Sequence, residues 1–122
     1  MPAFAKLSLV TSVFYPADIA FVNGWSQRAP GIGGWRVQFD KSVRTEQILV
    51  TPPASDVPVF AISRNGVKTV VERLLPDGSA GDEIGTFDSV RAAVLTLCPL
   101  HGEDLEAIHE ELERDFPRPP RR

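Results

Sequence analysis

The sequence has a single cysteine, Cys98, among its 122 residues, so no disulfide can form within the chain. One cysteine is typical of a protein from a reducing compartment, and its place in an apolar helical pattern predicts a small buried hydrophobe. No apolar run approaches the ~20 residues of a membrane-spanning helix, and the first residues lack the charged and apolar regions of a signal peptide. We therefore expect a cytoplasmic protein that does not associate with membranes.

The chain also has no excess of basic residues. Its net charge is −3 with a pI near 5.3, and residues 1–98 hold nine acidic and nine basic side chains. Residues 99–117 hold seven acidic side chains and one basic side chain, and three arginines follow in residues 118–122. A general nucleic-acid binder would need a basic face. Nucleic acid is therefore an improbable partner.

The sequence motifs that catalytic, metal and nucleotide sites require are absent as well. No Gly-x-Ser-x-Gly nucleophile elbow occurs, and the two histidines, His101 and His109, are eight residues apart, which is not the spacing of a helical metal pair. The glycine run 31–34 precedes a predicted strand and no Lys-Ser/Thr pair follows it, unlike a phosphate-binding loop. We therefore predict no catalytic residue, no metal ligand and no cofactor, and enzymatic activity stays undecided.

The clearest local pattern is a β-hairpin centred on Asn65-Gly66. This dipeptide favours a two-residue type I′ turn, in which both central residues need φ > 0. The register would then place Arg64 opposite Val67 and put one set of alternate side chains on the core face. That set is Phe60, Ile62, Val67 and Val71.

Two helices are predicted after the hairpin. The first covers about 89–98, begins at an N-cap on Asp88 or Ser89, and ends before Pro99. Its apolar stripe, which should pack on a face of the sheet, is Val90, Ala93, Val94 and Leu97.

The second helix, about 103–116, is acidic and amphipathic. Its stripe is Leu105, Ile108, Leu112 and Phe116. The stripe has two alternative partners: the rest of its own chain, or the same helix of another copy in a homodimer. The Pro/Arg tail 117–122 cannot bury apolar surface and should be flexible.

Strands are expected before the hairpin, and a short extended segment after it. Alternating apolar residues predict strands over 6–15, 35–40 and 46–51, with an extended piece at 83–87. For residues 16–23 both a helix starting at Pro16 and a strand fit, and we favour the strand because Ile19, Phe21 and Val22 are β-formers. The fold class is thus α+β: an antiparallel sheet of five or six strands with two helices, forming one domain over residues 1–116.

The functional prediction depends on the long irregular segment 23–34 and the strand start that follows it. Trp and Arg are enriched in binding hot spots, and binding residues often lie on loops carried by a rigid scaffold. We therefore expect a non-enzymatic protein-binding or adaptor module, with a composition typical of a high-GC bacterial genome. Its contact residues would be Trp25, Gln27, Arg28 and Arg36, whereas Trp35 would anchor the sheet.

Two alternatives come from other functional classes. A small enzyme would have a pocket under the same loop, with Asp18 or Asp40 as general base and Arg28 or Arg36 holding an anion. An acidic inhibitor or nucleic-acid mimic would act through helix 103–116, and its binding would weaken steeply with salt.

Overall fold

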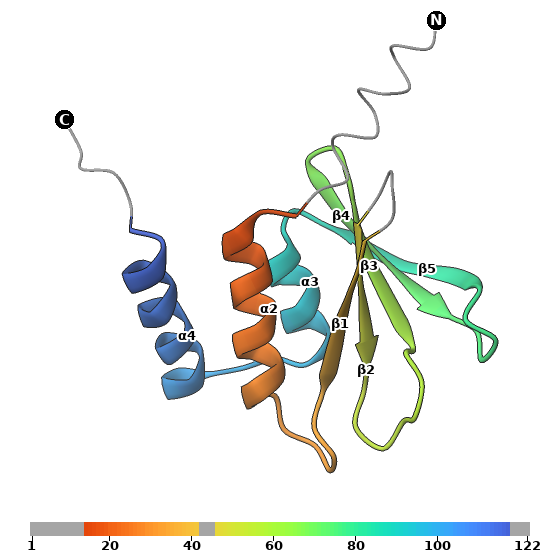
Figure 1. The fold of residues 1–122 in the computed structure, drawn as a ribbon, viewed down its shortest axis with the longest axis horizontal. Helices are drawn as coiled ribbons and strands as arrows, with labels where there is room; N and C mark the ends of the chain where they lie inside the picture. Colours follow the sequence, from red (N-terminus) through yellow and green to blue (C-terminus); the bar gives the residue numbers. More distant parts are fainter. Residues whose placement is uncertain (1–13, 42–45, 118–122) are drawn as a thin grey trace, which may run out of the picture.

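The computed structural model describes residues 14–41 and 46–117 and has an α+β fold (Figure 1). Five strands form one antiparallel sheet in the order β1-β2-β3-β4-β5, so each strand pairs with its neighbour in the sequence. The elements, in chain order, are α2 (Pro16–Arg28), β1 (Arg36–Lys41), β2 (Glu46–Thr51), β3 (Phe60–Asn65), β4 (Lys68–Leu74), β5 (Ala80–Phe87), α3 (Val90–Leu97) and α4 (Gly102–Asp115).

The three helices lie on one side of the sheet (Figure 1). α2 contacts β1, and α3 contacts β4 and β5, so these two helices cover the same face; α4 packs on α2 as an outer layer. The core lies between sheet and helices, and its large fully buried side chains include Phe21, Trp25, Ile48, Ile62, Val71 and Val94. The predicted α+β class, with an antiparallel sheet, a helix packed on it and a C-terminal helix, is confirmed. No helix in the described ranges is long and apolar enough to cross a membrane.

The predicted strand at residues 16–23 is wrong, because this segment forms the first two turns of α2. Pro16 occupies the start of the helix, where its missing N–H costs nothing. Phe21, Val22 and Trp25 are fully buried on one side of the helix, and this burial overrides their β propensity. The predicted strand over 6–15 lies mostly outside the described residues, and Tyr15, its last residue, is the N-cap of α2.

The β3–β4 hairpin exists, but its turn is displaced from the predicted position. Asn65 pairs with Lys68, so the two turn residues are Gly66 and Val67. Of these only Gly66 has a positive φ, 67°, which is the pattern of a type II′ turn rather than type I′. The register differs from the prediction by two residues, which leaves the faces unchanged and pairs Ile62 with Val71 in the core. Val67, predicted to be buried, is 79% exposed in the turn.

Both predicted C-terminal helices form. The Ser89 hydroxyl caps α3 by accepting a hydrogen bond of 3.0 Å from the Ala92 amide, and Val90, Ala93 and Val94 are buried. In α4 the stripe residues Ile108 and Leu112 are buried, and the helix packs on α2 of the same chain.

This contact buries Ile108 and Leu112 of the stripe within the chain, whereas Phe116 is 40% exposed, and the homodimer through α4 stays a prediction. The Cβ of a non-glycine residue at position 24 would lie 3.2 Å from Ile108 Cγ1, so Gly24 allows the close approach of α2 and α4. Residues 118–122 of the predicted tail lie outside the described ranges.

Candidate functional site

Trp25 lies in the core and not on a loop, which corrects the sequence-based prediction. It is in the third turn of α2, one turn after Phe21, and is 0% exposed. Its indole Nε1 donates a hydrogen bond of 2.9 Å to the Cys98 carbonyl, and its ring lies 5.3 Å from the Trp35 ring at 52°. Trp25 therefore offers no surface to a partner.

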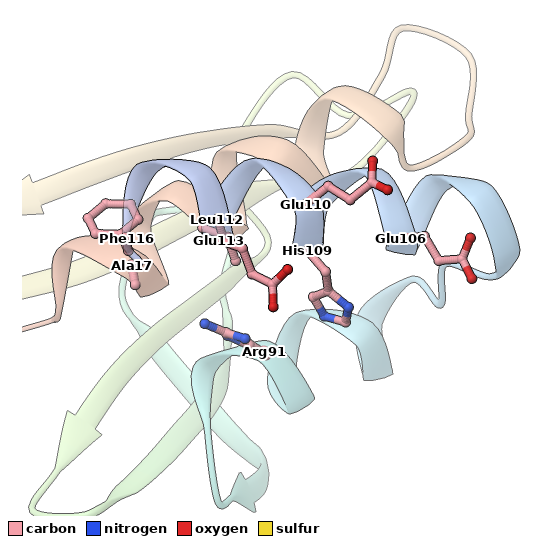
Figure 2. Close-up of a pocket in the computed structure, with 8 residues that line it drawn as sticks. All are labelled: Ala17, Arg91, Glu106, His109, Glu110, Leu112, Glu113 and Phe116. Atoms are coloured by element: carbon pink, nitrogen blue, oxygen red, sulfur yellow. The ribbon is translucent and has the colours of Figure 1, made fainter. Parts of the chain in front are cut away.

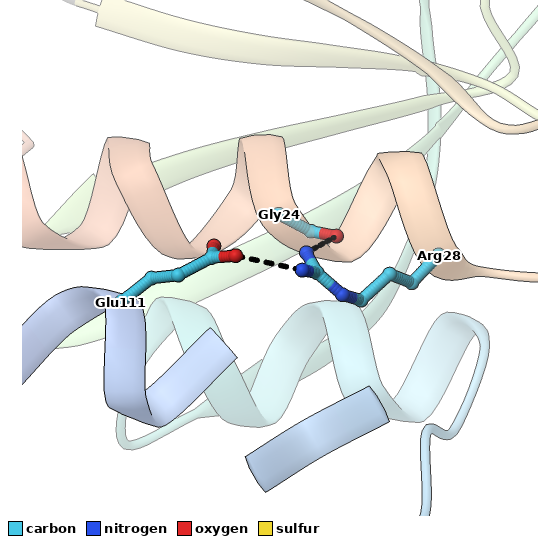
Figure 3. Close-up of polar contacts among 3 residues, drawn as sticks. All are labelled: Gly24, Arg28 and Glu111. Carbon is cyan, nitrogen blue, oxygen red and sulfur yellow. Dashed lines mark hydrogen bonds and ion pairs between the residues drawn. The ribbon is translucent and has the colours of Figure 1, made fainter. Parts of the chain in front are cut away.

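Arg28 is likewise used inside the chain. Figure 3 shows its guanidinium between two helices: Nη2 is 2.8 Å from Glu111 Oε2 on α4, and Nη1 donates to the Gly24 carbonyl of α2 at 3.3 Å. This arrangement ties α4 to α2 at a point where Gly24 already lets the helices approach closely. Gln27 is exposed on the rim of a small cavity of about 220 Å³ between the same helices.

The segment after α2 forms a braced loop. The Trp35 indole Nε1 donates a hydrogen bond of 3.0 Å to the Pro30 carbonyl, and the Gly34 amide donates one of 3.1 Å to the Gly31 carbonyl. Gly31 has a φ of 146°, and a Cβ there would lie 2.2 Å from Pro53 Cγ. The loop is therefore closed by its own hydrogen bonds and pressed against the β2–β3 connection.

A polar contact also joins the start of β1 to the β2–β3 connection. The Arg36 guanidinium donates to the Ser55 carbonyl, from the first residue of β1 to the β2–β3 loop. Both loops lie at one end of the sheet, and the β3–β4 turn lies at the opposite end (Figure 1). We call the side chains presented there the loop-end surface: Ile32, Trp35, Arg36 and Val57.

Apolar side chains are exposed on this surface, and Val67 and Tyr15 are also exposed, at 79% and 61%, near the β3–β4 turn at the other end of the sheet. Ile32 is 89% exposed, Val57 is 48% exposed and Trp35 is half-buried. Of the four residues predicted to bind a partner, only Arg36 belongs to it. Ile32 was not among the predicted contact residues, although its position as a single large apolar residue between Gly31 and Gly33 indicates an apolar side chain presented on a turn.

The residues of the enzyme hypothesis do not converge. Asp18 and Arg28 are at opposite ends of α2, about 15 Å apart at 1.5 Å per residue. Asp40 and Arg36 are separated by about 13 Å along β1. Partial burial raises the pKa of the Asp18 carboxyl, and the positive charges of Arg91 and Arg64 oppose that shift. No group of three or more described His, Cys, Asp or Glu side chains could hold a metal ion.

The acidic side chains of α4 are placed outward. Glu111 is used in the ion pair with Arg28, and six further carboxylates of α4 are exposed on the outermost helix (Figure 1). These are Glu103, Asp104, Glu106, Glu110, Glu113 and Asp115.

Comparisons of the chain with protein-family models, with curated proteins and with solved structures found no match.

Proposed function

We propose that this protein is a non-enzymatic binding module that recognises another protein through the loop-end surface. The observation that carries the proposal is the 89% exposure of Ile32 on a loop that is braced by two internal hydrogen bonds and by contact with Pro53. A flexible loop would lose conformational entropy on binding, and a braced loop loses less. The surface is thus built to present an apolar side chain at low cost.

The chemistry of the surface defines the partner. Burying an exposed isoleucine side chain in an apolar pocket contributes about 1.5–3 kcal/mol. Val57 and Trp35 extend the apolar contact, and the Arg36 guanidinium adds a positive charge at its edge. The matching partner surface has an apolar pocket for Ile32 and an acidic group near Arg36.

The test is a quantitative capture experiment on the full chain. Wild type, Ile32→Asp and the control Val67→Asp are used as baits in a lysate of the source organism, and bound proteins are quantified by mass spectrometry. Val67 is a matched control because it is 79% exposed in a turn at the other end of the sheet. We expect a partner that wild type and Val67→Asp retain equally and that Ile32→Asp loses. Equal retention by all three baits contradicts the proposal.

The six exposed carboxylates of α4 favour a second candidate, an acidic surface that binds a basic protein. Such binding would weaken steeply between low and high salt, because exposed charges are screened within about 8–10 Å at physiological ionic strength. A partner held by Ile32 would change little over the same salt range. Capture at two salt concentrations, with Glu103→Gln/Asp104→Asn as bait, separates the two surfaces.

A further inference from the structure

A groove on the helical side of the molecule is separate from the loop-end surface. It has a volume of about 640 Å³ and lies between α4, α3 and the first turn of α2 (Figure 2). Ligand pockets for small molecules fall in the range of about 300–1,000 Å³. The groove is therefore large enough for a small ligand, and its charged side chains indicate which ligand it would take.

Arg91 is the only basic residue of α3 and forms one wall of this groove. Its guanidinium carbon lies 5.3 Å from the centre of the Phe21 ring, which is fully buried and therefore holds the arginine in place. The His109 ring of α4 lies 6.0 Å from the same Phe21 ring, so both side chains rest on one aromatic platform. A cation held over a ring in this way is oriented by the ring.

The Arg91 guanidinium makes no ion pair with a described residue, although its positive charge acts on the Asp18 carboxyl of α2. No carboxylate within the described ranges lies within 4.0 Å of it, and no hydrogen bond to a described residue uses its N–H groups. Glu113 and His109 point from α4 toward Arg91 across the groove (Figure 2). An arginine fork has the geometry to bind a carboxylate through two parallel hydrogen bonds.

The opposite wall carries negative charge. Glu106, Glu110 and Glu113 of α4 line the groove and are exposed without an ion pair to a described residue, and of the three only Glu113 points toward Arg91 (Figure 2). A simple anion would be repelled by the three carboxylates, and a simple cation would be repelled by Arg91. A ligand that carries a negative group and a positive group at separate positions can pair with both Arg91 and the glutamates.

We propose that this groove binds a short peptide whose C-terminal carboxylate pairs with Arg91 and whose ammonium groups pair with the glutamates of α4. From Glu106 to Glu113 the helix rises about 10 Å, which equals about three residues of extended peptide. Phe116, which is 40% exposed, also lines the groove and supplies apolar contact. The ligand class is therefore a basic peptide of about three residues with a free C-terminus.

Calorimetric titration of the full chain with the tripeptide Lys-Lys-Ala tests this site. The same tripeptide as its C-terminal amide lacks the carboxylate, and we expect it to bind about tenfold more weakly because a charged bidentate hydrogen bond is lost. Acetylation of the two lysine side chains should weaken binding through loss of the contacts to Glu106 and Glu110. These comparisons use unaltered protein, so a folding defect cannot produce them.

Variants of the protein then test which residues of the two walls contact the peptide. Arg91→Lys, which keeps the charge and loses the fork, should bind the free acid several-fold more weakly and leave the affinity for the amide unchanged. Glu110→Gln should weaken binding of the lysine peptide, and Glu103→Gln, an exposed α4 residue that does not line the groove, should not. Equal affinities for acid and amide would overturn the proposal in favour of a cation site, and the absence of saturable binding would overturn it outright.

Discussion

Replacing Trp25 by alanine is the sharpest test of the fold, because it separates the described structure from the sequence-based expectation. The side chain is 0% exposed and is the largest of the fully buried residues. Its removal deletes the contact with the Trp35 ring at 5.3 Å and the hydrogen bond to the Cys98 carbonyl. It also removes the side chain through which the C-terminal end of α2 contacts the residue that follows α3.

The expected loss follows from these contacts. Large-to-small changes of buried tryptophan cost about 3–5 kcal/mol, and we place Trp25→Ala in this range. Trp25→Phe keeps a six-membered aromatic ring but removes the indole N–H and part of the ring volume at a fully buried site, so it should cost more than the about 1 kcal/mol of the hydrogen bond alone and less than Trp25→Ala. Trp35→Ala removes a half-buried ring and should cost about 1–3 kcal/mol.

Urea unfolding followed by far-UV circular dichroism measures these differences from the midpoint and slope. Ile32→Ala is the control, since a side chain that is 89% exposed contributes little to stability. The reasoning is refuted if Trp25→Ala leaves the midpoint unchanged, or if Trp35→Ala proves the more destabilising of the two. The sequence alone predicts that Trp35→Ala is the more destabilising of the two variants.

Three further changes test individual features. Gly31→Ala should destabilise the loop by more than about 1 kcal/mol, because its φ is 146° and the new Cβ would meet Pro53 Cγ at 2.2 Å; the same urea assay detects it. Ser89→Ala should cost about 1 kcal/mol through loss of the α3 cap, and Ser89→Asp should restore most of it. Asp18 has a pKa raised above its ordinary 3.8, so the folded state binds the proton more tightly than the unfolded state does. The contribution of Asp18 to stability should therefore fall as the pH rises from 3.8 through the raised pKa of the folded state. Asp77 and Asp88 have lowered pKa values and act in the opposite direction, but they are present in both wild type and Asp18→Asn. The free energy of unfolding of wild type minus that of Asp18→Asn should therefore decrease as the pH rises from the ordinary pKa of 3.8.

Local rules predicted the parts of the fold that depend on neighbours in the sequence. The Ser89 cap and the α3 stripe needed only the spacing of a few residues, and both helices were placed correctly. The core side of the hairpin was also correct, since a register error of two residues keeps every side chain on its face. The turn itself was misplaced because Gly66 can occupy either central position, and only the pairing of the strands decides which.

Tertiary contacts decided what the local rules could not. α2 combines β-branched and aromatic residues with a glycine, and it is helical because one side packs on the sheet and another admits α4 at Gly24. Because residues 16–23 were predicted to be a strand, Trp25 was wrongly placed on the loop expected to follow it. Of the predicted contact residues, Arg36 remains at an exposed end of the sheet, whereas the ion pair of Arg28 with Glu111 joins residues 83 positions apart, which no local pattern signals.

Site-specific photo-crosslinking tests the proposed binding surface most directly. p-Benzoylphenylalanine is placed at position 32, and at position 67 as the control, since both native side chains are more than three-quarters exposed and lie at opposite ends of the sheet. We predict that irradiation in a lysate of the source organism gives a discrete adduct with one protein from position 32 and none from position 67. Equal adducts from both positions, or a discrete adduct only when the probe replaces Glu110 on α4, would contradict the assignment of the loop-end surface.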